Sequence, residues 1–301
     1  MARVATDLTL AASYDTCRRL NARHGRSYYL ATLLLPPRKR PAVHALYAFA
    51  RYADEIVDDE RTVDRAAELS DWGTRFLTDV RSGASTDPVG RAVVDTIRRW
   101  DIPPSLFEDF LASMRLDLTV TSYPTYRDLE RYMWGSAAVI GLQMLPVLEP
   151  LVPDDEAAPY AIALGQAFQL TNFLRDIRED LGRGRVYLPQ EDLAAYGVTI
   201  DELTACRLSG AIRRLLAFEI ERTRTLYRRA EPGIGLLHPT SRVCVRTALR
   251  LYEGILDEIE RADYDVFRAR ATVSLPRRLA VVGPGLVRAR LTRRRELPTA
   301  G

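Results

Sequence analysis

The sequence predicts an all-α fold. Apolar residues recur at the three- and four-residue spacing of amphipathic helices over most of the 301 positions, whereas the alternating pattern of a half-buried strand is scarce. The chain contains no internal repeat, no low-complexity segment and no linker long enough to separate two domains. We therefore expect one all-α domain over residues 1–301, and 47% hydrophobic residues are enough to give it a sizeable core.

In the first half of the chain, proline and glycine mark the ends of the expected helices. Pro36 and Pro37 stop a short apolar segment at residues 27–35, and Pro41 is tolerated in the first turn of the long helix that follows. Residues 82–88 have the composition of a loop. Helices are expected over residues 7–23, 38–58, 64–81, 89–100, 104–116 and 126–147.

The second half contains a central helix and two further amphipathic helices. A linker at residues 149–155 carries two prolines and three acidic residues. The central helix is expected over residues 156–180, because Gly182, Gly184 and Pro189 break the pattern that follows. Two more helices are expected over residues 201–230 and 241–261. From about residue 276 the chain is basic, and we expect residues 285–301 to form a basic C-terminal tail.

The composition argues against several kinds of active site. The 43 basic and 40 acidic residues leave a net charge of +3, which is too small to indicate nucleic-acid binding. Three cysteines and three histidines are scattered, and form neither a metal-ligand spacing nor a disulfide framework. Lys39 is the only lysine and lies in a polar run, so a Schiff-base mechanism is not indicated. With no signal peptide and no apolar run of roughly 18 residues, a cytoplasmic protein is expected.

A stripe of polar side chains runs along the end of the expected central helix. Asn172, Asp176 and Asp180 are four residues apart and therefore lie on one helical face, with Gln169 at the head of the stripe. Carboxylates beside arginines suggest a hard cation shared with a phosphate. The alternative is a solvated face with ion pairs, and the stripe alone does not decide between them. Four arginines accompany it, at positions 175, 178, 183 and 185.

A second group of acids ends the helix expected over residues 38–58. Asp54 and Asp58 are four residues apart, and Glu55 and Asp59 form another such pair about 100° round the helix. Like charges at this spacing repel by a few tenths of a kcal/mol, which a bridging Mg²⁺ would remove. Arg51 lies on the face of Asp54 and could meet a phosphate, or it could pair with Glu55. Two such helices facing one another could hold metal ions and a diphosphate between them.

These motifs resemble those of the squalene/phytoene synthase family. The resemblance rests on HALYAFARYADEIVDD (residues 44–59), MWGSAAVIG (133–141) and QLTNFLRDIREDLGRGRVYLP (169–189), and covers about residues 22–278. Within the family, the sequence is most similar to the phytoene synthases of carotenoid-producing bacteria. The resemblance implies the class I isoprenoid synthase fold, with a central cavity between two aspartate-rich helices.

The resemblance also implies roles for individual residues. Asp54, Asp58 and Asp176 match catalytic aspartates, and Tyr132 matches a tyrosine near the carbocation, although a packed core tyrosine is the alternative. The small residues at 135–138 and 141 would let helices approach closely or leave room for a prenyl chain. The implied metal ligands are Asp54, Glu55, Asp58, Asn172, Asp176 and Asp180. The implied contacts with the substrate diphosphate are Ser27, Tyr47, Arg51, Gln169, Arg175 and Arg270.

The reaction implied by the resemblance is a head-to-head condensation of two geranylgeranyl diphosphates, dependent on Mg²⁺ or on Mn²⁺ in its place. It passes through a cyclopropylcarbinyl (prephytoene) diphosphate to phytoene, as in carotenoid biosynthesis. Because a proton is lost instead of a hydride being added, no NADPH is expected.

Two alternatives stay open. The first is synthesis of squalene, dehydrosqualene or hydroxysqualene from farnesyl diphosphate. The second is an arginine-rich helical module that binds RNA or another anion, against which the small net charge argues. The basic tail could also make a peripheral contact with an acidic membrane.

Overall fold

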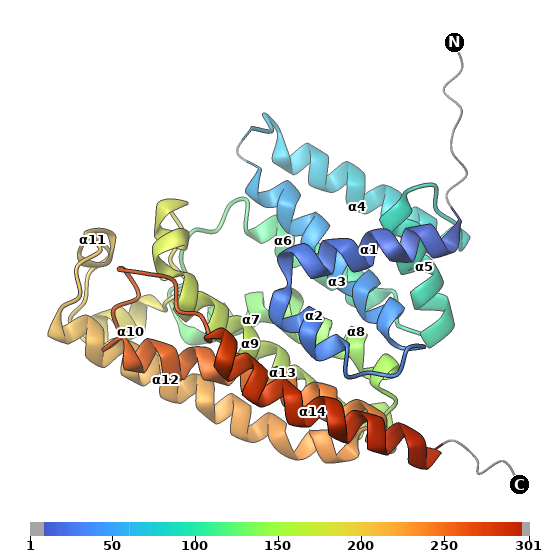
Figure 1. Cartoon of the computed structure of the whole chain (residues 1–301). Helices are drawn as coiled ribbons and strands as arrows, with labels where there is room; N and C mark the ends of the chain where they lie inside the picture. Colours follow the sequence, from blue (N-terminus) through green and yellow to red (C-terminus); the bar gives the residue numbers. More distant parts are fainter. Residues whose placement is uncertain (1–8, 60, 297–301) are drawn as a thin grey trace, which may run out of the picture.

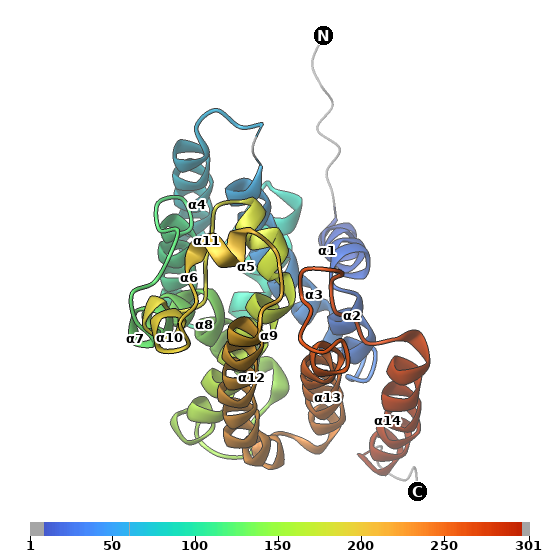
Figure 2. The ribbon, with the colours of Figure 1, turned by 90° about the vertical axis from the view of Figure 1, so that its left-hand side faces the viewer.

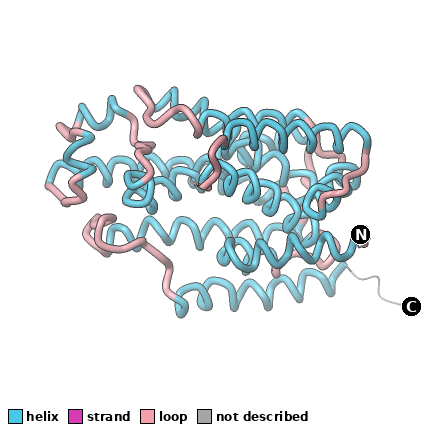
Figure 3. The backbone as a smooth tube through the Cα atoms, turned by 90° about the horizontal axis from the view of Figure 1, so that it is seen from above, coloured by secondary structure: helices cyan, strands magenta, loops and turns pink. Residues whose placement is uncertain are grey.

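The computed structural model describes residues 9–59 and 61–296, which fold into helices with no named strand (Figures 1 and 3). Within these residues the only β-pairing consists of two isolated bridges, Ser122 with Val186 and Pro150 with Leu237. The predicted all-α fold is confirmed. The helices are α1 (Leu10–His24), α2 (Arg26–Thr32), α3 (Arg40–Asp58), α4 (Arg65–Ser82), α5 (Pro88–Trp100), α6 (Ser105–Leu116), α7 (Tyr126–Met133), the π-helical turn η1 (Trp134–Ala138), α8 (Val139–Leu148), α9 (Asp154–Gly182), α10 (Gln190–Ala195), α11 (Ile200–Thr204), α12 (Gly210–Ala230), the 3₁₀ turn η2 (Glu231–Leu236), α13 (Pro239–Arg261) and α14 (Leu275–Glu296).

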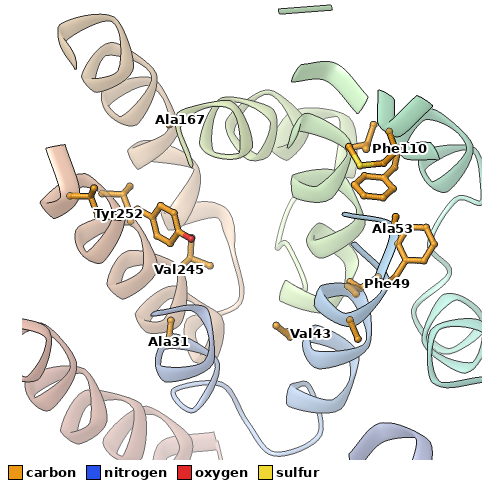
Figure 4. Packing of buried hydrophobic residues seen from close by; sticks show 14 of the residues in the cluster. Ala31, Val43, Phe49, Ala53, Phe110, Ala167, Val245 and Tyr252 are labelled. Carbon is orange, nitrogen blue, oxygen red and sulfur yellow. The ribbon is translucent and has the colours of Figure 1, made fainter. Parts of the chain in front are cut away.

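Phe49 fixes α3 within the N-terminal half of the molecule (Figure 4). Its ring centroid lies 4.6 Å from that of Phe76 on α4. The centroids of Phe107 and Phe110 on α6 are 5.1 and 5.3 Å away. All four rings are buried, and aromatic contacts of this kind stabilise a core by about 0.5–1.5 kcal/mol beyond the area that they bury. The packed face holds α3 in place while its last two turns carry the acids.

Helix α9 lies at the centre of the molecule, against α8, α12, α13 and η1 (Figure 1). Two glycines allow α9 to approach η1 and α8 closely. A Cβ added to Gly165 would lie 2.4 Å from the carbonyl oxygen of Ala137, and one added to Gly141 would lie 2.3 Å from that of Ala161. No larger residue fits unless the helices move apart. The small residues at 135–138 and 141 therefore serve close helix packing, which was one of the two interpretations of that run.

One helix predicted from the sequence is two separate helices in the structure. Residues 201–230 were expected to be continuous, but α11 ends at Thr204 and α12 begins at Gly210. The chain turns between them at Cys206, whose φ is 52°. The hydroxyl of Ser209 then accepts a 3.2 Å hydrogen bond from the backbone N–H of Ile212 and caps the new helix. The prediction was wrong because helical spacing on both sides of a short break looks continuous.

Within the predicted basic tail, residues 285–296 belong to helix α14. This helix lies beside α13 at the edge of the molecule (Figure 2). Val282 and Ala289 are seven residues apart and buried on the same face. Arginine is a good helix former, so a run of arginines does not prevent a helix where apolar residues recur at the right spacing. Residues 297–301 and the predicted helix start at residue 7 lie outside the described residues.

Lys39, the only lysine, is fully buried. Its Nζ donates to the hydroxyl of Ser241 at 2.8 Å and pairs with the carboxylate of Glu149 at 2.7 Å. The ammonium group therefore ties the start of α3 to the end of α8 and the start of α13. No helix in the described part of the chain is both long and apolar enough to cross a membrane.

A buried histidine predicts how stability depends on pH. His44 on α3 accepts a 3.0 Å hydrogen bond at Nδ1 from Asn21 on α1, and burial lowers its pKa to about 4. The unfolded chain takes up this proton near pH 6.5, so the native state loses up to about 3 kcal/mol as the pH falls from 6.5 to 4. We expect His44→Gln to flatten this part of the pH profile of unfolding free energy, measured with urea. The same change at the exposed His24 should leave the profile nearly as steep, and equal flattening in both variants would contradict the assignment.

Candidate active site

The last two turns of α3 hold three carboxylates and an arginine. Arg51 donates to Asp54 at 2.6 Å and to Glu55 at 3.1 Å, so the ion pair considered as an alternative is present and includes both acids. The Asp54 side chain remains 48% exposed. The surrounding protein and the nearby Asp58 nevertheless raise its pKa to about 6. Asp54 therefore lies in a site that water can reach but that strongly disfavours its negative charge.

On the facing side of α9, Asp176 is held between two arginines. Arg175 donates to its two oxygens at 2.8 and 2.5 Å. Arg270, from the segment between α13 and α14, donates to the same oxygens at 2.7 and 2.8 Å. Burial alone would raise the pKa of Asp176, but these hydrogen bonds bring it below its ordinary value. The structure thus brings Arg270 to an aspartate that precedes it by 94 positions.

Asn172 and Asp180, at the ends of the same stripe, have oxygens without partners. The Oδ1 atom of Asn172 is buried and accepts no hydrogen bond from any described residue, while its Nδ2 donates to Gln169 at 3.4 Å. Asp180 forms no side-chain hydrogen bond or ion pair with a described residue. Burial, which has the largest effect, and the negative charge of Asp176 together raise the pKa of Asp180 to about 8. Both are oxygen donors that a divalent cation would satisfy.

The segment after α9 connects the two acidic helices. Arg185 donates to Asp58 at 3.0 Å, and Arg183 lies 3.5 Å from the other oxygen of the same carboxylate. Asp58 therefore faces the end of the stripe. Among the described residues, however, no three His, Cys, Asp or Glu side chains are close enough to form a metal-binding group. Mg²⁺ needs only one or two carboxylates where phosphate oxygens and water complete its shell, so the six predicted ligands remain a prediction.

The other residues expected to contact a diphosphate share one neighbourhood. Ser27 is in the first turn of α2, directly after Gly25 and Arg26. A Cβ on Gly25 would lie 2.6 Å from the ring of Tyr47 on α3, so the two helices touch there. The ring of Tyr28 lies 6.2 Å from Tyr47 and 4.8 Å from Tyr252, and the nearby charge of Arg175 opposes the rise that burial causes in the pKa of Tyr252. Tyr47 and Arg175 are thus linked through the rings of Tyr28 and Tyr252, and Ser27 directly precedes Tyr28 in the chain.

A second set of rings lies beside the aspartates; we call it the ring cluster (Tyr123, Tyr132, Phe173 and Tyr187). The rings of Phe173 and Tyr187 are stacked 4.0 Å apart, and those of Tyr132 and Tyr187 are 5.8 Å apart. Tyr132 is only 3% exposed, as the core interpretation required. Both interpretations of Tyr132 are compatible with the structure. The ring cluster borders the acidic site, because Phe173 and Tyr187 line one small pocket together with Asp180 and Arg185.

Asp117 is the residue of this region that the sequence did not reveal. It accepts hydrogen bonds from the hydroxyls of Tyr132 at 2.8 Å and Tyr187 at 3.2 Å. Burial raises its pKa to about 6, despite these bonds and the positive charge of Arg185. Asp117 directly follows α6, and no other acidic residue lies four positions before or after it, so the sequence shows no stripe of acids that would indicate a site. Tyr187 had a signal, since it lies within the motif at residues 169–189.

Two charged residues of the same motif, Arg178 and Glu179, lie on the exposed side of α9. Arg178 donates to the carbonyl oxygen of Phe267 at 2.9 Å and so holds the segment after α13. Glu179 is half exposed and pairs loosely with Arg270 at 3.6 Å. For these two residues, the interpretation as ion-paired or structural surface groups holds.

The sequence matches the squalene/phytoene synthase family over residues 21–277. The chain belongs to this family. It is 39% identical to a phytoene synthase of Arthrospira platensis, over 95% of this chain and 96% of that protein. It is 38% identical to a 15-cis-phytoene synthase of Synechocystis, over 93% of this chain and 86% of that protein. The predicted family is therefore confirmed, and the chain is a prenyltransferase-type enzyme, not a binding module.

Solved structures of the squalene/phytoene synthase family have the same fold. A dehydrosqualene synthase crystallised with a ligand superimposes with a TM-score of 0.86 at 27% identity, covering 94% of this chain and 98% of that one. Squalene synthase HpnC from Alicyclobacillus acidocaldarius gives a TM-score of 0.77 at 30% identity, covering 86% and 97%. The predicted isoprenoid synthase fold is confirmed.

The lone carboxylate of Asp180 predicts an active-site change that stabilises the protein. In buffer with EDTA, Asp180→Asn should raise the free energy of unfolding by about 1–2 kcal/mol, because it removes a half-buried carboxyl group whose ionised form is disfavoured by burial and by Asp176. Urea denaturation measures this difference. Glu179→Gln, one position earlier on α9, is the control and should change stability by less than about 0.5 kcal/mol. A destabilised Asp180→Asn variant would show that this carboxylate has a stabilising partner.

Proposed function

We propose that this enzyme condenses two molecules of geranylgeranyl diphosphate head to head to give phytoene. The observation that carries the proposal is the contact of Arg185 with Asp58, which brings the acids of α3 to the stripe of α9 beside the ring cluster. A site of this kind combines groups that bind a diphosphate with aromatic faces that stabilise a carbocation. The identity of 36–39% with phytoene synthases over at least nine-tenths of the chain supports this product.

The oxygen donors of the site fit Mg²⁺ or Mn²⁺. We propose that the α3 acids and the stripe hold the metal, because the Oδ1 of Asn172 is buried without a partner among the described residues, and because burial and the charge of Asp176 disfavour the ionised form of Asp180. When bound, the metal would neutralise charge on the departing diphosphate. The proposed ligands are Asp54, Glu55, Asp58, Asn172, Asp176 and Asp180.

The chain's own side chains would carry out the remaining parts of the reaction. Arg51, Arg175 and Arg270 provide guanidinium groups that suit bidentate contacts with phosphate oxygens. Ser27, Tyr47 and Gln169 would complete the set around the diphosphate. The faces of Tyr132 and its neighbours would stabilise the allylic cation and exclude water that would quench it. Loss of a proton ends the reaction, so NADPH is not required.

Farnesyl diphosphate is the second candidate substrate. The ligand-bound dehydrosqualene synthase has the same fold with a TM-score of 0.86, which supports a chemistry shared by both chain lengths. Its identity of 27% is lower than that of the phytoene synthases, and this favours the C20 substrate. Incubation with C15 or C20 diphosphate, with and without NADPH, followed by chromatography of the products, distinguishes the two. A reduced product formed only with NADPH would overturn the phytoene assignment.

Removal of one aspartate from either helix should abolish turnover. Asp54→Ala and Asp176→Ala are expected to lower the conversion of geranylgeranyl diphosphate by at least about a thousandfold, because each removes charge at the diphosphate site. Circular dichroism should show that the helical fold survives. Asp71→Ala, which removes an exposed carboxylate of α4, should keep wild-type activity. Full turnover by either active-site variant would contradict the proposed arrangement.

Substitution of Tyr132 separates the role of its ring from that of its hydroxyl. Tyr132→Leu removes the aromatic face and should lower kcat by about 30-fold, as expected for the loss of about 2 kcal/mol of cation–π stabilisation. Tyr132→Phe keeps the ring and loses only the hydrogen bond to Asp117, so kcat should fall less than about tenfold. Steady-state kinetics would measure both. Equal losses in the two variants would assign the effect to the hydroxyl and Asp117.

A further inference from the structure

Asp117 joins three separate segments of the chain at the ring cluster. It directly follows α6, and its two carboxylate oxygens accept hydrogen bonds from Tyr132 of α7 at 2.8 Å and from Tyr187, after α9, at 3.2 Å. The backbone N–H of Val186 donates to the carbonyl oxygen of Thr121 at 2.7 Å, which ties the segment of Tyr187 to the chain that follows Asp117. Contacts between distant parts of the sequence therefore set the positions of both hydroxyls relative to one carboxylate.

The carboxylate of Asp117 forms no ion pair with a described residue. Its oxygens accept only the two tyrosine hydroxyls, whereas Asp58 and Asp176 pair with arginines. Arg185 donates to Asp58, and its charge acts on Asp117 only from beyond ion-pair distance. Burial raises the pKa of Asp117 to about 6, so this carboxyl group is mostly ionised at neutral pH. A negative charge that no ion pair neutralises therefore borders the ring cluster.

Hydrogen bonds to a carboxylate make a tyrosine ring a better partner for a cation. A phenol hydroxyl that donates to an anion is polarised, which increases the electron density of its ring, and the negative face of the ring attracts cations. The two polarised rings belong to one stacked group, because Tyr187 lies 5.8 Å from Tyr132 and 4.0 Å from Phe173. The hydroxyl of Tyr123, whose ring lies 5.3 Å from that of Tyr132, is buried and has no hydrogen-bond partner among the described residues. The hydrogen bonds of Asp117 thus select two of the three tyrosines.

We propose that Asp117 is a positioning residue that supplies the counter-charge for the carbocation, acting through the hydroxyls of Tyr132 and Tyr187. This inference rests on the proposed carbocation chemistry, but not on the length of the prenyl chain. The departing diphosphate is held at the arginines of the acidic site, whereas the charge of Asp117 acts at the ring cluster. A neutral acceptor would hold the two hydroxyls in place equally well, so the test has to separate the charge of Asp117 from its hydrogen bonds.

Asp117→Asn removes the charge and keeps the size and hydrogen-bonding capacity of the side chain. The probe is geranylgeranyldimethylamine, which is a cation at neutral pH, added with Mg²⁺ and pyrophosphate and compared with uncharged geranylgeraniol by calorimetry. Asp117→Asn should weaken binding of the ammonium ion about tenfold and binding of the alcohol less than about twofold, because only the cation interacts with the charge. Asp109→Asn is the matched control. Asp109 lies on α6 and accepts a 2.9 Å hydrogen bond from Trp134, outside the ring cluster, so both affinities should stay unchanged.

Turnover gives a second measurement on the same variants. With geranylgeranyl diphosphate, Asp117→Asn should lower kcat about tenfold and change KM less than about twofold, because the charge acts on the cation and not on the bound substrate. Tyr187→Phe removes one of the two hydrogen bonds and keeps the ring, so it should weaken ammonium binding about threefold. It also tests the proposal if Asp117→Asn does not fold, which circular dichroism would show.

The outcomes separate this inference from the proposed function. If Asp117→Asn weakened binding of the ammonium ion and the alcohol equally, Asp117 would have only a structural role and the inference would be overturned. Lost turnover with unchanged ammonium affinity would also overturn it, because Asp117 would then act in proton transfer. A protein that bound the ammonium ion through Asp117 but converted neither C15 nor C20 diphosphate would support this inference and contradict the proposed function.

Discussion

The site depends on arginines that hold mutually repelling carboxylates near one another. Asp54 and Asp58 repel each other on α3, and Asp176 repels Asp180 on α9. Without compensation, such groups would separate or take up protons. Arg185 compensates Asp58, and two arginines compensate Asp176. Because these cations come from the end of α9 and from the segment after α13, the acidic site also ties distant parts of the chain together.

The position of the stripe also depends on backbones that touch. Gly141 and Gly165 let α8, η1 and α9 approach until a single added Cβ would meet a carbonyl oxygen. Such backbone contact fixes the distance of α9 from α8 and η1 and the rotation of α9 about its own axis, because no flexible side chains lie between the backbones to absorb a shift. The rotation matters most, since it decides whether Asn172, Asp176 and Asp180 face α3 or solvent. Small residues remote from the acids therefore determine the direction in which the acids point.

Local sequence patterns predicted the helices and the two acidic groups, because periodicity and four-residue spacing are properties of one helix. These patterns did not predict the structure correctly where contacts with another helix or segment determine it. The break before Ser209 and the helical state of residues 285–296 depend on packing against neighbouring helices. Asp117 accepts hydrogen bonds from Tyr132 and Tyr187, which are 15 and 70 positions away in the sequence. No local sequence pattern around Asp117 predicts these contacts. Tyr132 was found only through the family motif, since its own surroundings resemble any buried core.

The same arginines that hold the carboxylates in this structure are those proposed to bind the diphosphate. Arg51 is paired with Asp54 and Glu55, and Arg175 and Arg270 with Asp176. If a cation alone bound the carboxylate of Asp176, the guanidinium groups of Arg175 and Arg270 would lose their counter-charge. If a diphosphate alone bound these arginines, the carboxylate of Asp176 would lose its own counter-charges. Each ligand therefore removes the cost that the other creates, and linkage requires that each strengthens the binding of the other. Among the described residues, no arginine forms a hydrogen bond or ion pair with the side chain of Asn172 or Asp180, so a cation could bind there without displacing an arginine.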